Sequence, residues 1–179
     1  MKYLDLSNNK FTEFPGFKLP KLQYLDVSFN KLEKVSDAWT GHGNLKILKS
    51  VDNKFKNLNF CKNMPKLEEL YLAKNKISSI SGYEGLPALK KLHLRKNVIE
   101  KIDDELAELP ELCYLNIRSN GVANMEMMLK LLQYPKLTDM NCINTPLELS
   151  YSSMSLFIGE VLIKFPKVKR FCKLNIEDH

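Results

Sequence analysis

The chain has 179 residues, with 27 Lys and Arg against 21 Asp and Glu, and a formal net charge of +6. This balance favours acidic partners in general and does not select nucleic acid over protein. No apolar run approaches the length of a membrane-spanning helix, and no signal peptide precedes the first repeat, so we expect an intracellular, soluble protein with no membrane partner.

Sequence features that carry enzymatic chemistry are missing. The chain has no phosphate-cradling glycine loop, no cluster with metal-ligand spacing and no evident pairing of a nucleophile with a base. The cysteines lie far apart, which favours free thiols of a reducing compartment; they are Cys61, Cys113, Cys142 and Cys172. The histidines do not cluster either; they are His42, His93 and His179. We therefore expect a protein that is not an enzyme and needs no cofactor or metal.

One pattern recurs along the chain, and its clearest copy is LKKLHLRKNV, residues Leu89–Val98. Apolar residues stand at places one, four and six, and an asparagine stands at place nine. The seven copies open at Met1, Leu22, Leu45, Leu67, Leu89, Leu112 and Leu137. A repeat of about 20–29 residues with this signature marks a leucine-rich repeat. The sequence predicts an α/β fold: a right-handed solenoid with a parallel concave sheet, short helical or irregular convex segments and a helical C-terminal cap.

The ninth place forms a column of asparagines. It reads Asn9, Asn30, Asn53, Asn75, Asn97 and Asn120, and becomes Thr145 in the last copy. An amide side chain donates and accepts at once, so it can satisfy backbone groups that a turn leaves unpaired. We predict that these residues form a structural asparagine ladder, bonded to the backbone of the turns.

The repeats fill residues 1–147, and the pattern begins at Met1 itself. Leu4 and Leu6 belong to the first strand, and no cap precedes them. Because an open solenoid end exposes its core, we expect that upstream sequence or a partner covers this end, or that the first repeat frays. Residues 148–179 predict a C-terminal cap: an amphipathic helix over 156–165 and a final extended segment at Val168 and Phe171.

The convex segments carry three further signals. Met125, Met128, Leu129 and Leu132 have helical spacing, which predicts a helix over about 124–133. Trp39 is expected to pack between convex segments. Ser50 stands where the sixth-place leucine belongs, so its buried hydroxyl needs a hydrogen-bond partner.

Side chains alternate along a strand, so places three, five and seven face outward on the concave sheet. The early strands combine tyrosines with Asp5 and Asp26, and the later strands gather basic and aromatic residues. Tyr and Arg are favoured interface anchors. We predict that protein partners, such as an acidic helix or tail, bind the concave residues Tyr24, Tyr71, Lys91, His93, Arg95, Tyr114 and Arg118.

The repeat form, near 22 residues with N-x-I or N-x-L after the strand, resembles the short leucine-rich repeats of the phosphatase-regulator type. The run from LKKLHLRKNVIEKI through LCYLNIRSNGV, followed by FIGEVLIKFP and KVKRF, is similar to the radial-spoke leucine-rich-repeat proteins. This resemblance covers roughly residues 67–173. It departs from that family at Thr145-Pro146, where Asn-Pro is common. It implies a structural component of the ciliary axoneme, in the radial spoke, that binds other spoke or axonemal subunits.

The same repeat class contains three alternatives. A phosphatase regulator would present acidic and aromatic residues along the whole concave face, whereas the later half here is basic. An axonemal dynein light chain would share the repeat type and the location. A splicing-complex repeat protein would be nuclear and would bind a small RNA-binding domain. Direct binding of nucleic acid is disfavoured, because acidic residues interrupt the concave tyrosines: Asp5, Asp26, Glu69 and Asp139.

Overall fold

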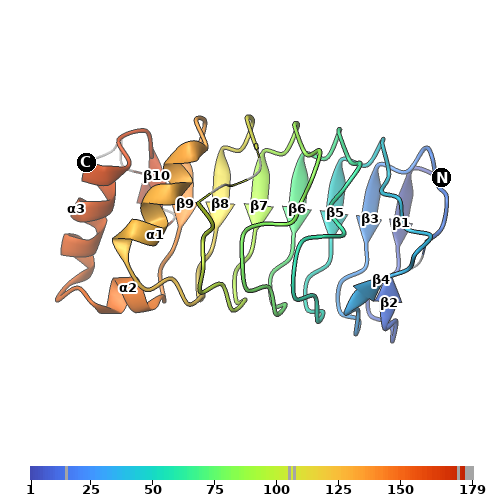
Figure 1. Ribbon diagram of the computed structural model, residues 1–179, viewed down its shortest axis with the longest axis horizontal. Helices are drawn as coiled ribbons and strands as arrows, with labels where there is room; N and C mark the ends of the chain where they lie inside the picture. The colour runs from blue at the N-terminus through green and yellow to red at the C-terminus, as the bar shows by residue number, and fades with distance from the viewer. Residues whose placement is uncertain (15, 105, 107, 173, 176–179) are drawn as a thin grey trace.

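The computed structural model describes residues 1–14, 16–104, 106, 108–172 and 174–175. Seven three-residue strands stand side by side along the length of the molecule (Figure 1). They are β1 (Tyr3–Asp5), β3 (Tyr24–Asp26), β5 (Ile47–Lys49), β6 (Glu69–Tyr71), β7 (Lys91–His93), β8 (Tyr114–Asn116) and β9 (Asp139–Asn141). Each pairs in parallel with the next. The predicted leucine-rich-repeat solenoid is confirmed.

The register puts equal repeat places opposite one another, as in the pairs Leu70↔Leu92 and Leu92↔Leu115. The sheet continues past the repeats into β10 (Arg170–Phe171), which is parallel to β9, and β11 (Leu174–Asn175), which is antiparallel to β10. A second, two-stranded sheet joins β2 (Glu13–Phe14) to β4 (Lys34–Val35). The exposed side of the long sheet, called the sheet face below, is the surface predicted to be concave.

One continuous core lies between the long sheet and the return segments. The fourth-place residue of each strand from β3 to β9 points into it and is almost fully buried; these residues are Leu25, Leu48, Leu70, Leu92, Leu115 and Met140. Leu4 in β1 is only partly buried. Apolar burial of this kind is the main stabilising contribution, and each repeat completes its share only against its neighbours.

The ladder asparagines join consecutive turns. Asn75 is 8% exposed, and its Oδ1 accepts from Phe55 N at 3.0 Å. Its Nδ2 donates to Ser50 O at 2.8 Å and to Leu72 O at 3.1 Å. Asn53, Asn97 and Asn120 are buried with the same kind of bonds. At the start of the chain the ladder is looser, because Asn30 is partly buried and Asn9 is exposed.

Each ladder position is preceded by a residue in the left-handed region, with φ between 55 and 57°. These residues are Asn8, Phe29, Asp52, Lys74, Lys96, Ser119 and Asn144. Bulky residues such as Phe29 and Lys74 rarely adopt this conformation unless neighbouring contacts fix it. The hydrogen bonds that the ladder asparagines make with the backbone of the turn supply those contacts.

The predicted convex helix is present, but its second half winds more tightly than expected. An α-helix, α1 (Met125–Leu129), continues into a 3-10 helix, η1 (Lys130–Gln133). Leu132, which the helical spacing placed with the core-facing residues, is 52% exposed, and Leu131 is buried instead. A 3-10 helix has three residues per turn, so the residue that follows Met128 inward is Leu131.

The C-terminal segment closes the core with two helices. The helix α2 (Pro146–Leu149) begins at the cap Thr145, and α3 (Met154–Lys164) begins at the cap Ser153. Phe157 and Val161 of α3 are buried against Phe171 of β10 and its neighbours. The boundary at residue 147, the open first repeat and its cover stay predictions. The cap's residues 173 and 176–179, including His179, lie outside the described part.

Trp39 and Ser50 both have the partners their burial requires. Trp39 is buried between convex segments, where its Nε1 donates to Phe60 O at 2.8 Å and its ring contacts Phe14 edge-on. Ser50 is fully buried, and its Oγ accepts from Asn53 Nδ2 at 3.2 Å. The irregular repeat therefore uses its serine as an additional acceptor for the ladder.

Candidate functional site

The sheet face brings three of the predicted partner-binding residues into one stack of rings. The Tyr71 and His93 ring centroids are 4.4 Å apart, and those of His93 and Tyr114 are 4.7 Å apart. The rings come from consecutive strands, β6 to β8, because the parallel register repeats the outward direction from strand to strand. The result is a rigid aromatic wall near the C-terminal half of the sheet.

Tyr24 belongs to a separate group at the N-terminal end. Its ring stacks on Tyr3 with centroids 4.3 Å apart. Lys49 Nζ lies between the two aromatic groups, 5.2 Å from the Tyr24 centroid and 5.7 Å from the Tyr71 centroid. A lysine at this distance makes a cation–π contact with each ring.

Lys91 does not contribute a free positive charge. Its Nζ lies 2.9 Å from Glu69 Oε1, and Tyr71 OH donates to Glu69 Oε2 at 2.5 Å. The hydrogen bond from Tyr71 and the bond from Lys91 lower the pKa of Glu69. The pKa of Tyr71 rises to about 12, chiefly because of burial and then because of the Glu69 carboxylate. Both tyrosine and lysine thus serve to hold one ionised glutamate.

His93 is uncharged at neutral pH. Burial within the ring stack lowers its pKa to about 4, and this outweighs the opposing effect of Glu69. Sequence reasoning counted His93 with the basic residues of the later strands. In the structure it acts as a flat, neutral ring.

Arg95 and Arg118 have no acidic partner among the described residues. They stand at the seventh places that follow β7 and β8, so they are neighbours across the sheet. Within the described part of the chain neither guanidinium makes a hydrogen bond or an ion pair, and Arg118 Nε is buried without a partner. The predicted basic zone is therefore narrower than the sequence indicated and centres on this arginine pair.

A hollow of about 480 Å³ opens on the sheet face beside the aromatic wall. It is lined by Tyr71, Lys91, His93, Tyr114, Asp139, Met140, Asn141 and Arg170. This volume lies within the usual range of ligand sites, roughly 300–1,000 Å³. Four of the predicted residues thus share one hollow, and Arg95 and Arg118 are not part of its lining.

The hollow's far wall includes residues that the sequence prediction left out of the site. Asp139 and Asn141, from β9, are outward-facing as predicted, yet both are buried at 8% and 5% exposure. Arg170 of β10 binds Asp139 with two bonds, Nε to Oδ1 at 2.6 Å and Nη2 to Oδ2 at 2.8 Å. The sequence does contain a signal for Arg170. If the half-repeat KVKRF forms one more strand of the sheet, this arginine stands opposite Asp139.

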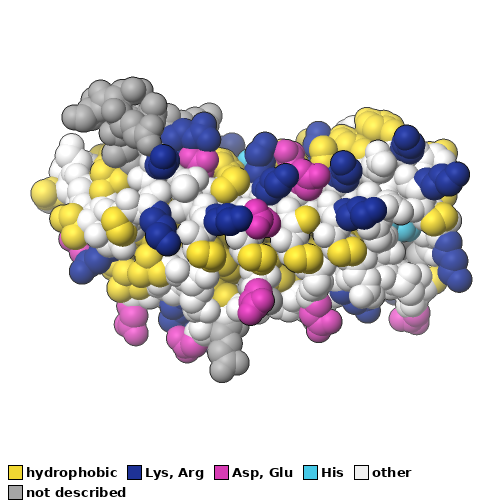
Figure 2. Space-filling view, turned by 90° about the horizontal axis from the view of Figure 1, so that it is seen from above, with side chains coloured by type: hydrophobic (Ala, Val, Ile, Leu, Met, Phe, Trp, Pro, Cys, Tyr) yellow, Lys and Arg dark blue, Asp and Glu magenta, His cyan; other side chains and the backbone are white. Residues whose placement is uncertain are grey.

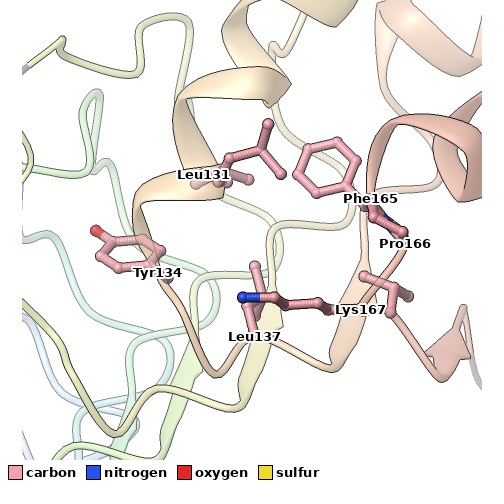
Figure 3. A pocket seen from close by; sticks show the side chains of 8 residues that line it. Leu131, Tyr134, Leu137, Phe165, Pro166 and Lys167 are labelled. Atoms are coloured by element: carbon pink, nitrogen blue, oxygen red, sulfur yellow. The ribbon is translucent and has the colours of Figure 1, made fainter.

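A second cavity, of about 90 Å³, lies between η1 and the C-terminal cap (Figure 3). It is lined by Leu131, Leu132, Tyr134, Leu137, Phe165, Pro166, Lys167 and Val168. Lys167 lies across it, with Nζ 3.4 Å from Pro135 O. The cavity is small and apolar and carries no convergent polar groups, so it is a packing gap beneath the cap.

Figure 2 looks onto the edge where the strands begin, and shows Lys and Arg side chains in rows among apolar and acidic ones. Lysines next to the first residues of the strands are paired: Lys90 with Glu68 at 2.9 Å and Lys136 with Glu111 at 2.6 Å. Exposed pairs of this kind contribute little to stability, about 0–1 kcal/mol each. The edge is a mixed, largely compensated surface and a weaker candidate than the sheet face.

Two further classes of site are not found among the described residues. No group of three or more His, Cys, Asp or Glu side chains there could hold a metal ion. In the same part of the chain no helix has both the length and the hydropathy that a membrane crossing requires. All four cysteines are free thiols.

The family model described as leucine-rich repeats (2 copies) matches residues 1–38 and 65–108. The strands and the asparagine ladder continue the same repeat to β9. The chain therefore has the leucine-rich-repeat fold. Proteins of this class are in general non-enzymatic interaction modules, whose sheet forms an extended binding surface. The comparison with curated proteins finds no match.

Solved structures share the fold of this leucine-rich-repeat protein. The internalin InlF of Listeria monocytogenes is similar with a TM-score of 0.71 and 21% identity, over 98% of this chain and 48% of that chain. The SNF/U2A′ complex of Drosophila melanogaster gives 0.59 and 21%, over 69% and 68%. The leucine-rich-repeat domain of APL1B gives 0.64 and 22%, over 87% and 42%. The chain thus spans about half the length of the internalin.

Proposed function

We propose that this leucine-rich-repeat protein is a non-enzymatic scaffold that holds a protein partner on its sheet face. The observation that carries the proposal is the hollow beside the Tyr71–His93–Tyr114 stack, next to two arginines without acidic neighbours. Rigid aromatic rings and arginine are the side chains that most often anchor interfaces. The rings cost little conformational entropy on binding, because they already contact one another.

The arginine pair indicates the chemistry of the partner. Arg95 and Arg118 have no described acidic partner within the chain, so a carboxylate from outside can approach both. The neighbouring Lys91 is already bound to Glu69. An acidic helix or tail therefore suits this part of the sheet face. Its attraction to the arginines would speed association and make binding weaken as salt concentration rises.

A charge-reversal experiment tests the scaffold. The double variant Arg95→Glu, Arg118→Glu should lose partner capture after native purification, with the steepest loss at low salt. Lys54→Glu, Lys76→Glu changes the net charge equally, at exposed residues that follow the ladder asparagines. That control should capture the partner as the wild type does. Full retention by a folded Arg95, Arg118 variant would remove the binding site from this part of the sheet face.

For the cellular role, we propose a structural component of the ciliary axoneme, in the radial spoke, with spoke or axonemal subunits as partners. The support is the resemblance of the later repeats and the closing helix, LKKLHLRKNVIEKI through KVKRF, to radial-spoke repeat proteins. Endogenous tagging tests this: the protein should co-purify with axonemes and label spoke proteins by proximity. A protein that is absent from cilia would contradict it.

A second candidate is a splicing-complex repeat protein. The observation that favours it is the similarity to the chain in the SNF/U2A′ complex, which covers 68% of that chain. The two candidates predict different locations and partners. A nuclear protein that captures a small RNA-binding-domain protein would support the second candidate and contradict the axonemal one.

A further inference from the structure

Tyrosine and a polar side chain form a recurring pair on the sheet face. In β3, Tyr24 OH donates to Asp26 Oδ2 at 3.3 Å. In β8, Asn116 Nδ2 donates to Tyr114 OH at 3.1 Å. In both strands the tyrosine stands at the third place and its polar partner at the fifth. The phenol of each pair lies along its own strand and fixes the fifth-place side chain.

Strand β9 has the second member of this pair without the first. Its fifth-place residue is Asn141, in register with Asn116 of β8, but Asp139 stands where Tyr114 would be. Arg170 binds both oxygens of Asp139 and holds this carboxylate at the edge of the sheet. Asn141 is 5% exposed, its Oδ1 has no partner, and its amide makes no hydrogen bond within the described residues.

The same strand interrupts the ring stack. Rings come from β6, β7 and β8 in turn, as Tyr71, His93 and Tyr114. On β9 the short side chains of Asp139 and Asn141 leave the next position of the stack open, and the hollow of about 480 Å³ extends there. His93 contacts Tyr114 from the β7 side, so the hollow adjoins Tyr114 on the β9 side.

The chemistry of the hollow selects its occupant. A buried amide oxygen without a hydrogen bond, such as Asn141 Oδ1, is costly, and an occupant that donates to it recovers that cost. The charges around the hollow are compensated, since Lys91 pairs with Glu69 and Arg170 with Asp139, and His93 is neutral. A neutral, planar group with a hydroxyl fits both requirements. A phenol can stack on Tyr114 and can both accept from and donate to an amide.

We propose that the hollow receives a tyrosine side chain of the protein partner, with its ring stacked on Tyr114 and its hydroxyl bonded to the Asn141 amide. This places a tyrosine beside the acidic segment that Arg95 and Arg118 attract, and it rests on the proposed scaffold function. The partner's residue would repeat on β9 the Tyr114–Asn116 arrangement of β8.

The probe is N-acetyl-tyrosinamide, titrated into the full chain and followed by NMR at the Asn141 side-chain amide and the Tyr114 ring. N-acetyl-phenylalaninamide is the matched probe, because it differs only by the hydroxyl. The tyrosine probe should bind at least about fivefold more tightly, the effect expected of one hydrogen bond to a buried group. Equal affinities, or no shift at Asn141 with either probe, would overturn the proposal.

Variants locate the effect. Asn141→Leu keeps the size of the side chain and should abolish the preference for the tyrosine probe, whereas Asn57→Leu, at an exposed residue outside the lining of the hollow, should keep it. Asp139→Tyr restores the pattern of β8 within the chain, so its own phenol should occupy the hollow and exclude the probe. A preference that survives in Asn141→Leu, or unchanged binding in a folded Asp139→Tyr, would contradict the assignment.

Titration with nucleosides tests whether the hollow binds a nucleobase instead of a tyrosine. Adenosine and uridine present planar rings with polar edges, so tighter binding of either than of the tyrosine probe would assign the hollow to a nucleobase and overturn the proposal. The charge-reversal test at Arg95 and Arg118 is independent of these titrations. If those reversals abolish partner capture but the tyrosine probe does not bind, only the tyrosine inference fails. If the probe binds but the reversals leave capture intact, the arginine-centred scaffold fails.

Discussion

Lys91 Nζ lies 2.9 Å from Glu69 Oε1, at directly opposite places of two neighbouring strands. This pair changes which residues of the sheet face can attract an acidic partner. The positive charge of Lys91 is already compensated one strand away, and the carboxylate is further held by Tyr71 OH. Arg95 and Arg118 have no such neighbour among the described residues, so their guanidinium groups are open to an acidic partner.

The first prediction compares two substitutions that each remove one positive charge. Arg95→Gln should weaken partner binding and reduce its salt dependence, whereas Lys91→Gln should change both less, because its charge is compensated by Glu69. Affinity measured over a salt series for both variants checks this. Equal losses for the two variants would mean that the partner displaces Glu69 from Lys91.

The second prediction concerns the ladder. Asn75→Ala removes one acceptor and two donated bonds from buried backbone, so it should lower the free energy of unfolding by about 1–3 kcal/mol. Asn9→Ala is the matched control, because Asn9 is exposed and bonds only within its own turn, to Leu6 O and Ser7 O. It should cost about 0.5 kcal/mol or less. Urea unfolding measures the change in the free energy of unfolding for both variants. Similar losses would contradict a stabilising role for the buried amides.

Much of the fold could be predicted because the same pattern of leucines and asparagines recurs from repeat to repeat. The leucines at places one, four and six indicate strands with one buried side, and the register follows because every strand has the same phase. The column that contains Asn53, Asn75 and Asn97 indicated the turn. Left-handed backbone at Phe29 and Lys74 was not predictable, because neither residue type favours it and the ladder bonds impose it.

The site was less predictable, because it depends on pairings between side chains of different repeats. Nothing in the column of outward residues says that Lys91 neutralises Glu69, or that burial keeps His93 uncharged. Arg170 lies in a degenerate half-repeat, so its place beside Asp139 depends on β10 joining the sheet. The helical spacing around Met125 likewise could not reveal the change to 3-10 winding that turns Leu131 inward.

The third prediction concerns Thr145, which replaces the ladder asparagine in the last repeat. Its hydroxyl donates to Cys142 O at 2.9 Å and accepts from Glu148 N at 3.4 Å, so it closes the last turn and caps α2. Thr145→Ala should cost about 0.5–2 kcal/mol, the range for loss of a helix cap.

Two variants serve as controls for this prediction. Thr145→Ser keeps the hydroxyl and should recover most of the stability. Ser153→Ala removes the cap of α3, but Ser153 is exposed and makes no described bond to a buried carbonyl, so it should cost less than Thr145→Ala. A thermal unfolding series that ranks Ser153→Ala as the more destabilising change would assign the effect to capping alone.

The fourth prediction is a pH dependence of stability that originates at His93. Burial lowers its pKa from 6.5 to about 4, so between these values the unfolded chain binds a proton that the folded chain does not. The contribution of His93 to stability is therefore fully present above pH 6.5 and is lost as the pH falls towards 4. Glu69 favours the charged imidazole and Lys91 opposes it, but burial is the larger effect.

His93→Phe isolates this contribution, because it keeps a flat ring between Tyr71 and Tyr114 and removes the titrating group. The free energy of unfolding of the variant, measured by urea at a series of pH values from 4 to 6.5, should fall less steeply on acidification than that of the wild type. A residual slope is expected in both proteins, since burial also lowers the pKa of His42. Parallel curves for the two proteins would show that the imidazole of His93 can accept a proton without leaving the stack, and that its burial does not govern its charge.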